Sequence, residues 1–140
     1  MTDPLISVDD LTIRFQTDEG LITAVDKVSF DIKPGEVLGL VGESGCGKTT
    51  AGRAILRLLD PTSGNVTFEG RNVATLPESE LKPTRRNMQV IFQDPFASLN
   101  PRMTVGQIIA EPLRVYNLVE DQTAALRRVG QLLGDVGLPI

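Results

Sequence analysis

Apolar and polar positions alternate near the start of the chain, and this alternation predicts two β-strands separated by a turn. The first strand covers residues 6–15, with an interruption at Asp9-Asp10 after which Leu11, Ile13 and Phe15 share one face. The second covers residues 25–32, and the dipeptide Pro34-Gly35 ends it. The turn lies at residues 17–20. We therefore expect a β-rich beginning to the fold.

The stretch from Glu36 to Val41 is rich in valine and leucine and predicts a third, buried strand. Residues 50–59 then follow the helical period, with one apolar face made by Ala51, Ile55, Leu58 and Leu59. After a break at residues 60–64, we expect a short strand at residues 65–68 and a hairpin-like turn at residues 69–72.

The remainder of the chain is predicted to be mostly helical. A short helix lies within residues 76–86, a further apolar strand covers residues 87–92, and a proline-containing loop covers residues 93–102. Thr104 is expected to cap a helix over residues 105–115, and Asp121 another that reaches Val136 with Gly137 in the C′ position.

Composition narrows the class of protein. The 140 residues carry a formal net charge of −4, which gives no electrostatic footprint for nucleic acid, and the pairs Arg85-Arg86 and Arg127-Arg128 read as solvated helix faces. The beginning of the sequence lacks the apolar core of a secretory signal, and no run has the length of a membrane span. The single cysteine, Cys46, excludes an internal disulfide and fits a reducing compartment.

Between the apolar run and the first helix lies a complete G-x-x-x-x-G-K-[ST] motif, which predicts a phosphate-binding loop. Its residues are Gly42, Glu43, Ser44, Gly45, Cys46, Gly47, Lys48 and Thr49, followed by Thr50. Glycines let the backbone curl so that N–H groups point at phosphate oxygens, and the helix N-terminus adds favourable dipole charge. Lys48 is expected to reach the β- and γ-phosphates of a nucleoside triphosphate, and the Thr49 hydroxyl to ligate Mg²⁺.

Two alternative interpretations of the motif are weaker. A plain glycine-rich turn between strand and helix would not require all four fixed positions or both flanks to match. Cys46 is interpreted as a small filler residue within the loop, with a redox role as the less favoured possibility.

Several further stretches resemble the ATP-binding subunits of ABC transporters. These are Ala24-Val25-Asp26-Lys27-Val28-Ser29-Phe30, Pro61-Thr62-Ser63-Gly64 and Val90-Ile91-Phe92-Gln93-Asp94-Pro95. The stretch from Phe96 to Val105 is similar to the oligopeptide, dipeptide and nickel importer branch. The resemblance implies an α/β P-loop NTPase fold over residues 1–140 as part of one nucleotide-binding domain. It would comprise an antiparallel β subdomain, an incomplete, mostly parallel core sheet, and the start of the helical subdomain.

The resemblance also implies roles for individual residues. Gln93 would contact Mg²⁺ and the attacking water, as both a catalytic residue and a metal ligand. A glutamine suits this role because its amide can donate and accept hydrogen bonds. The alternative is that Gln93 is only a polar residue at a strand end. Phe15 would stack on adenine; the less favoured alternative is a core residue, because it shares a strand face with Leu11 and Ile13. The loop from Asp94 to Met103 would be where the permease docks.

Other elements of the family's catalytic machinery are absent from the sequence. There is no Leu-Ser-Gly-Gly-Gln signature, no apolar run ending in Asp-Glu, and no histidine. These absences indicate the N-terminal part of a longer ATPase subunit. We expect it to bind ATP weakly, not to hydrolyse it alone, and to leave strand edges that the missing half would pair.

As part of such a subunit, the chain would dimerise with a sister ATPase and bind two transmembrane permease subunits on the cytoplasmic side of the membrane, taking up peptides or a related small solute. Two alternatives stay open: a stand-alone, non-catalytic nucleotide-binding or regulatory module, and a soluble ABC ATPase that serves an enzyme complex.

Overall fold

The computed structural model describes residues 3–94 and 98–139, which form two compact units, Met1–Gln89 and Val90–Ile140. Each unit has a hydrophobic cluster of its own. The first contains all the strands of the described residues and the phosphate-loop motif, whereas the second is helical.

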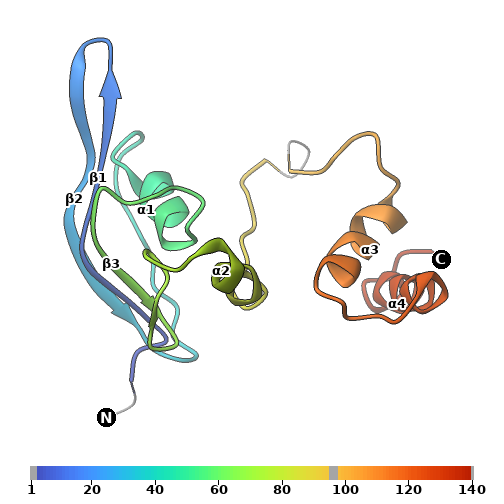
Figure 1. Ribbon diagram of the computed structural model, residues 1–140. Helices are drawn as coiled ribbons and strands as arrows, with labels where there is room; N and C mark the ends of the chain where they lie inside the picture. Colours follow the sequence, from blue (N-terminus) through green and yellow to red (C-terminus); the bar gives the residue numbers. More distant parts are fainter. Residues whose placement is uncertain (1–2, 95–97, 140) are drawn as a thin grey trace. The chain divides into compact units, whose positions relative to one another are not determined.

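The first unit begins with a long antiparallel hairpin of β1 (Ile6–Thr17) and β2 (Gly20–Ile32), joined at Asp18-Glu19 (Figure 1). The predicted turn and both predicted strands are confirmed. The register shifts between Val8 and Leu11, where Asp10 has a φ of 48°. This irregularity is the interruption that the sequence predicts at Asp9-Asp10.

A further irregularity of the hairpin lies nearer its turn. Arg14 pairs with Thr23 and Ile13 pairs with Val25, so Ala24 is an extra residue of β2 without a Cα partner. Such a β-bulge bends the strand and increases its twist, and bulges are common beside functional sites.

The other side of β1 pairs with β3 (Ser63–Phe68), which in turn pairs with the short β4 (Arg71–Asn72). The sheet order is β2-β1-β3-β4, and each neighbouring pair is antiparallel. Glu69 and Gly70, between β3 and β4, have φ values of 48° and 77°, which is the left-handed geometry of a tight hairpin turn. The predicted short strand and its hairpin are therefore confirmed.

Two helices, α1 (Lys48–Ile55) and α2 (Glu78–Arg85), contribute to the main core with the sheet. That core is made of Val8, Leu11, Ile13, Val25, Ala51, Ala54, Val66, Phe68, Val73 and Leu81. Burying a large aliphatic side chain stabilises the fold by about 1.5–3 kcal/mol relative to leaving it exposed, so this cluster holds the first unit together.

Helix α1 ends earlier than the sequence predicts. Arg57 has a φ of 53°, its Nε donates to the Ala74 carbonyl at 3.1 Å, and its own carbonyl accepts a hydrogen bond from Arg85. The left-handed backbone at Arg57 turns the chain out of the helix. The prediction that Leu58 belongs to the apolar face of this helix is therefore wrong, and its side chain is half exposed.

The second unit contains the helices α3 (Val105–Val115) and α4 (Gln122–Asp135), which pack through Ala110, Leu113 and Val129. Thr104 and Gln107 form a reciprocal capping box, and the Asp121 carboxylate accepts from the Ala124 N–H at 2.7 Å. Both predicted helices and both predicted caps are confirmed. None of the helices in the described part of the chain combines the length and apolarity needed to cross a membrane.

The strands predicted at residues 36–41 and 87–92 are wrong for the structure described here. Neither segment is a strand, and the side chains of Val37, Val41 and Ile91 are 95%, 93% and 99% exposed. Across residues 3–94 and 98–139 every strand pairing is antiparallel, so the expected mostly parallel core sheet is not found there. A strand requires a ladder partner for its N–H and C=O groups, and these segments have none among the described residues.

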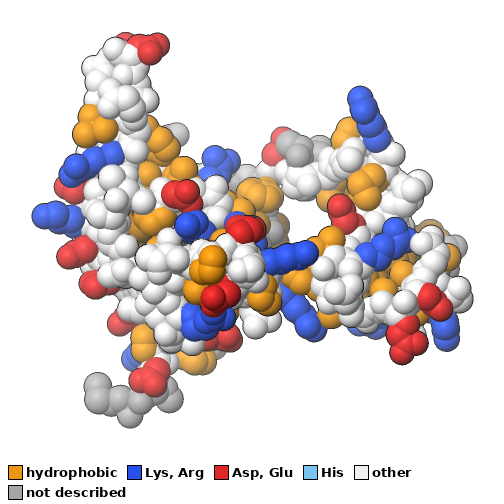
Figure 2. Space-filling model, in the orientation of Figure 1, with side chains coloured by type: hydrophobic (Ala, Val, Ile, Leu, Met, Phe, Trp, Pro, Cys, Tyr) orange, Lys and Arg blue, Asp and Glu red, His pale blue; other side chains and the backbone are white. Residues whose placement is uncertain are grey.

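Hydrophobic side chains reach the surface in both units, for example Val41 in the first and Leu126 in the second. Figure 2 shows them interspersed with charged side chains on the face it displays.

Candidate functional site

The phosphate-loop motif lies in the first unit, where it leads into α1 and contacts β2. Gly47 is the N-cap of α1 with a φ of 94°, and a Cβ at this position would lie 2.2 Å from the Ala24 carbonyl oxygen. Glycine is therefore required here both by the left-handed backbone and by the close approach. The contact fixes the end of the loop at the β-bulge of Ala24.

The Lys48 side chain folds back across the loop. Its Nζ donates to the Gly42 carbonyl at 2.7 Å and to the Glu43 carbonyl at 2.6 Å, and it lies 3.5 Å from the Cys46 sulfur. The Cys46 N–H donates in turn to the Glu43 carbonyl at 3.3 Å. These bonds close residues 42–48 into a curled loop with an ammonium group at its centre.

The N-terminus of α1 supplies further positive charge. The first N–H groups of a helix have no partner within it, no side chain caps α1, and its first turn contains no acidic residue. Thr49, on this first turn, is exposed, and Thr50 is half-buried. A short helix concentrates this favourable partial charge in its first turn, where an anion can approach the free N–H groups.

Cys46 packs against the start of the motif. A Cβ on Gly42 would lie 2.6 Å from the Cys46 sulfur, so a small residue at position 42 accommodates the cysteine. The thiol is free and the residue is exposed. This packing supports the interpretation of Cys46 as a filler residue, which stays a prediction.

Phe15 lies on β1 at the turn end of the hairpin. It shares the face of Ile13, which is buried in the core, but Phe15 itself is 38% exposed. It therefore continues the core face of the sheet without being enclosed by it. A role in binding a base stays a prediction.

Gln93 is an exposed residue in a bend of the second unit, whereas Lys48 and Thr49 belong to the first. Its contact with the phosphate loop stays a prediction. In the predicted permease-docking loop from Asp94 to Met103, the residues Pro95, Phe96 and Ala97 lie outside the described residues. The described residues of that loop are exposed, apart from the half-buried Met103.

The donor set for magnesium in the first unit is small. Across residues 3–94 and 98–139 no group of three or more histidine, cysteine, aspartate or glutamate residues could hold a metal ion. The exposed hydroxyl of Thr49 suits Mg²⁺, which is commonly bound through few protein oxygens together with substrate phosphates. The loop therefore fits a metal that arrives with a nucleotide.

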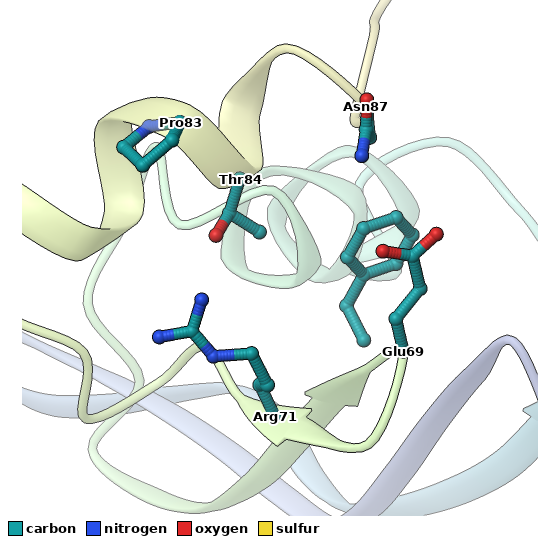
Figure 3. Close-up of a pocket in the computed structure, with 6 residues that line it drawn as sticks. Glu69, Arg71, Pro83, Thr84 and Asn87 are labelled. Atoms are coloured by element: carbon teal, nitrogen blue, oxygen red, sulfur yellow. The ribbon is translucent and has the colours of Figure 1, made fainter.

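A pocket of about 180 Å³ lies elsewhere in the first unit, between the β3–β4 hairpin and α2 (Figure 3). Phe68, Glu69, Arg71, Pro83, Thr84 and Asn87 line it. Arg71 points from the hairpin towards α2, where its guanidinium pairs with Glu80 at 2.5 Å. Because this carboxylate neutralises the one cationic lining residue, the pocket is less suited to a phosphate than the loop is.

The loop is recognisable from the sequence, but its anchor is not. Ala24 became recognisable as part of the site only through the bulge and its distance to Gly47, and neither leaves a local sequence signal. The position of Ile22 opposite Phe15 was also missed, although the two-residue turn at Asp18-Glu19 determines that register.

Comparisons with known proteins agree with this geometry. The profile of the family described as ABC transporter matches residues 25–139. The oligopeptide transport ATP-binding protein OppF of Bacillus subtilis is 51% identical over 139 residues, which are 99% of this chain and 46% of OppF. The glutathione import ATP-binding protein GsiA of Pectobacterium atrosepticum is 49% identical over 143 residues, 97% of this chain and 23% of GsiA.

A solved structure gives the same result for the fold. The ATP-binding cassette MJ0796, in a dimeric post-hydrolysis state bound to ADP and Pi, superposes with a TM-score of 0.79 at 27% identity. The match covers 96% of this chain and 58% of that one. This chain spans less than half the length of OppF and of a Brucella ovis relative named for peptide import, of which it covers 43%. The phosphate loop, the antiparallel sheet beside it and the family match together place the chain, with part of the cassette fold, in the ABC transporter family.

Proposed function

We propose that this chain binds Mg-ATP through residues 42–49 and is the loop-bearing part of the ATP-binding subunit of an ABC importer for peptides or a related small solute. The observation that carries the proposal is the loop itself: Gly47 is pressed against the Ala24 carbonyl, and Lys48 lies across a curled backbone. OppF and GsiA, named for oligopeptide and glutathione transport, support the class of solute.

Lys48, Thr49 and the backbone N–H groups of the loop have defined tasks in this proposal. Lys48 exchanges its bonds to the Gly42 and Glu43 carbonyls for bonds to β- and γ-phosphate oxygens. The backbone N–H groups at the start of α1 bind the same phosphates, and the Thr49 hydroxyl orients the accompanying metal. Magnesium, when bound, neutralises phosphate charge. Phe15 supports the base.

Hydrolysis needs groups that these residues do not supply. Gln93 would position the attacking water, but the sequence offers no Asp-Glu pair after an apolar run to act as magnesium ligand and general base. A positioned general base contributes about 10² to 10⁴ in rate, or roughly 3–5 kcal/mol of barrier. We therefore propose that the chain alone binds ATP without turning it over.

In an assembled transporter the proposed partners are a sister ATPase subunit and two permease subunits, at the cytoplasmic side of the membrane. The loop from Asp94 to Met103 is the proposed contact with the permease, and its described part is largely exposed. The dimeric form of the MJ0796 cassette supports pairing of two ATPase subunits.

Titration of the chain with Mg-ATP, followed by calorimetry and by thermal unfolding, tests the proposal. A ligand at a hundredfold excess over its Kd stabilises the protein by about 2.7 kcal/mol. We expect Lys48→Ala to weaken binding at least tenfold, equivalent to about 1.4 kcal/mol, because it removes the ammonium group at the centre of the loop.

Lys82→Ala is the matched control, since it removes an exposed lysine on α2 and should leave the affinity unchanged. The same samples, assayed for phosphate release, should show no Lys48-dependent turnover. Binding that survives Lys48→Ala would contradict the assignment of the loop, and Lys48-dependent turnover would contradict the absence of hydrolysis.

A further inference from the structure

The pocket between the β3–β4 hairpin and α2 is lined by two side chains of opposite charge, and all its lining residues belong to the first unit. In Figure 3 the Glu69 carboxylate and the Arg71 guanidinium lie on opposite sides of it. Its volume of about 180 Å³ is below the roughly 300–1,000 Å³ of pockets that hold drug-sized ligands. The pocket therefore suits a molecule of the size of an amino acid or a dipeptide.

Both walls of the pocket are attached to the main core. On the hairpin side, Glu69 has a φ of 48°, its N–H donates to the Leu5 carbonyl at 3.0 Å, and the preceding Phe68 is only 5% exposed. On the helix side, Thr84 is buried and its hydroxyl donates to the Glu80 carbonyl at 3.0 Å. The lining side chains thus project from fixed backbone, as in most small-molecule sites, which are largely pre-formed.

The polar groups of the pocket retain unused hydrogen-bonding capacity. Within residues 3–94 and 98–139 neither the Glu69 carboxylate nor the Asn87 side-chain amide has a hydrogen-bond partner. Arg71 donates through one nitrogen to Glu80, and a guanidinium has five N–H donors. The side chains of this ion pair are 49% and 53% exposed, and exposed pairs contribute little to stability, so Arg71 is available to a second carboxylate.

We infer that this pocket binds a zwitterionic amino acid or dipeptide, with the ligand's ammonium group at Glu69 and its carboxylate at Arg71. A carboxylate only accepts hydrogen bonds and an ammonium group only donates them, so each end of such a ligand has one complementary wall. A simple anion would meet the charge of Glu69, and a simple amine would leave the donors of Arg71 unused. Phe68 and Pro83 provide apolar surface for the carbon atoms of the ligand. The inference does not depend on nucleotide binding by residues 42–49.

Titration of the isotopically labelled whole chain with the dipeptide leucylglycine, followed by amide chemical shifts in NMR spectra, tests the inference. We expect saturable shifts at residues 69–71 and 83–87, with a Kd of about 1 mM or below. N-acetyl-leucylglycine lacks the ammonium group and leucylglycinamide lacks the carboxylate. Each should bind about three- to fivefold more weakly than leucylglycine, because each loses one charge-assisted hydrogen bond at a partly exposed site.

Glu69→Gln removes the charge of the carboxylate and keeps the size of the side chain. It should weaken binding of leucylglycine about three- to fivefold, and N-acetylation of the dipeptide should cost nothing further in this variant. Glu19→Gln is the matched control, since it removes an exposed carboxylate at the turn of the β1–β2 hairpin and should change the affinity by less than about twofold. The same spectra show whether each variant is folded.

The dipeptide series on the unsubstituted chain decides the inference even if Glu69→Gln does not fold. Absence of saturable shifts at residues 69–71 and 83–87 up to about 10 mM leucylglycine would overturn it, as would equal binding of the N-acetylated dipeptide. Equal binding of leucylglycinamide would overturn the part assigned to Arg71. Titration with Mg-ATP is a separate measurement at residues 42–49, so failure of the proposed function is distinguishable from failure of this inference.

Discussion

Two apolar regions of the first unit have similar side chains and opposite environments. In the antiparallel sheet, Val25 is 6% exposed and Leu11 is fully buried, whereas in residues 36–41 Val37 is 95% exposed and Leu40 is half exposed. Both regions read as strands from their apolar content, but the first forms a ladder and the second does not. Apolar composition thus favours burial without determining what will cover the segment.

The difference lies in backbone hydrogen bonding. β1 is paired along both edges, with β2 on one side and β3 on the other, so its N–H and C=O groups are satisfied while its apolar face meets α1 and α2. Residues 36–41 have no such neighbour among the described residues. An extended segment without a ladder gains little by ordering, because it loses conformational entropy without replacing its bonds to water.

The largest expected effect that tests this comparison comes from a pair of identical substitutions. Leu11→Ala removes a fully buried side chain from the main core and should lower the free energy of unfolding by about 2–5 kcal/mol. Leu40→Ala, at a half-exposed position in residues 36–41, should change it by less than about 0.5 kcal/mol.

Urea denaturation followed by circular dichroism measures both values. Equal losses of stability for the two variants would contradict the comparison, because they would mean that residues 36–41 are packed in solution.

The same contrast explains how far the sequence predicts this fold. Local signals were reliable: the Thr104–Gln107 capping box, the Asp121 cap and the tight turn at Glu69-Gly70 all depend on residues within four positions of one another. Each is determined by local geometry alone. The predicted strand at residues 36–41 depends on a distant partner, which no local pattern reveals.

The candidate site divides in the same way. The identity of the loop was predictable, because its chemistry depends on consecutive residues from Gly42 to Thr49. The anchor at Ala24 and the pairing of Phe15 with Ile22 depend on the register of a hairpin more than twenty residues before the loop's last glycine, Gly47. Gln93 lies in the other unit, so its role rests on resemblance alone.

The next largest effect on the free energy of unfolding is expected at Gly47, which joins the phosphate loop to α1 and lies against β2. Gly47→Ala places a Cβ 2.2 Å from the Ala24 carbonyl and strains a left-handed backbone, so we expect a loss of at least about 2 kcal/mol. Gly45→Ala is the control: its φ is also positive, at 81°, but its Cβ would meet nothing within 4 Å. Its expected cost is about 1 kcal/mol, from backbone strain alone.

Thermal unfolding of both variants measures the difference between their losses of stability. That difference is the cost of the close approach between the loop and β2, because both variants share the strain of a positive φ. If the two substitutions are equally costly, the loop is not held against β2 at Ala24.

The smallest expected change in stability lies within the exposed segment. Val37→Lys replaces a side chain that is 95% exposed, so the free energy of unfolding should change by less than about 0.5 kcal/mol. The same substitution should raise the concentration at which the chain stays monomeric, because a charge interrupts an apolar extended segment that can pair with another copy. Leu126→Lys, on α4, removes an apolar side chain that is 59% exposed and should alter neither property.

Light scattering over a concentration series, together with urea denaturation, distinguishes the two variants. A loss of stability above about 1 kcal/mol for Val37→Lys would exceed the usual range for surface sites and would place this segment in the core.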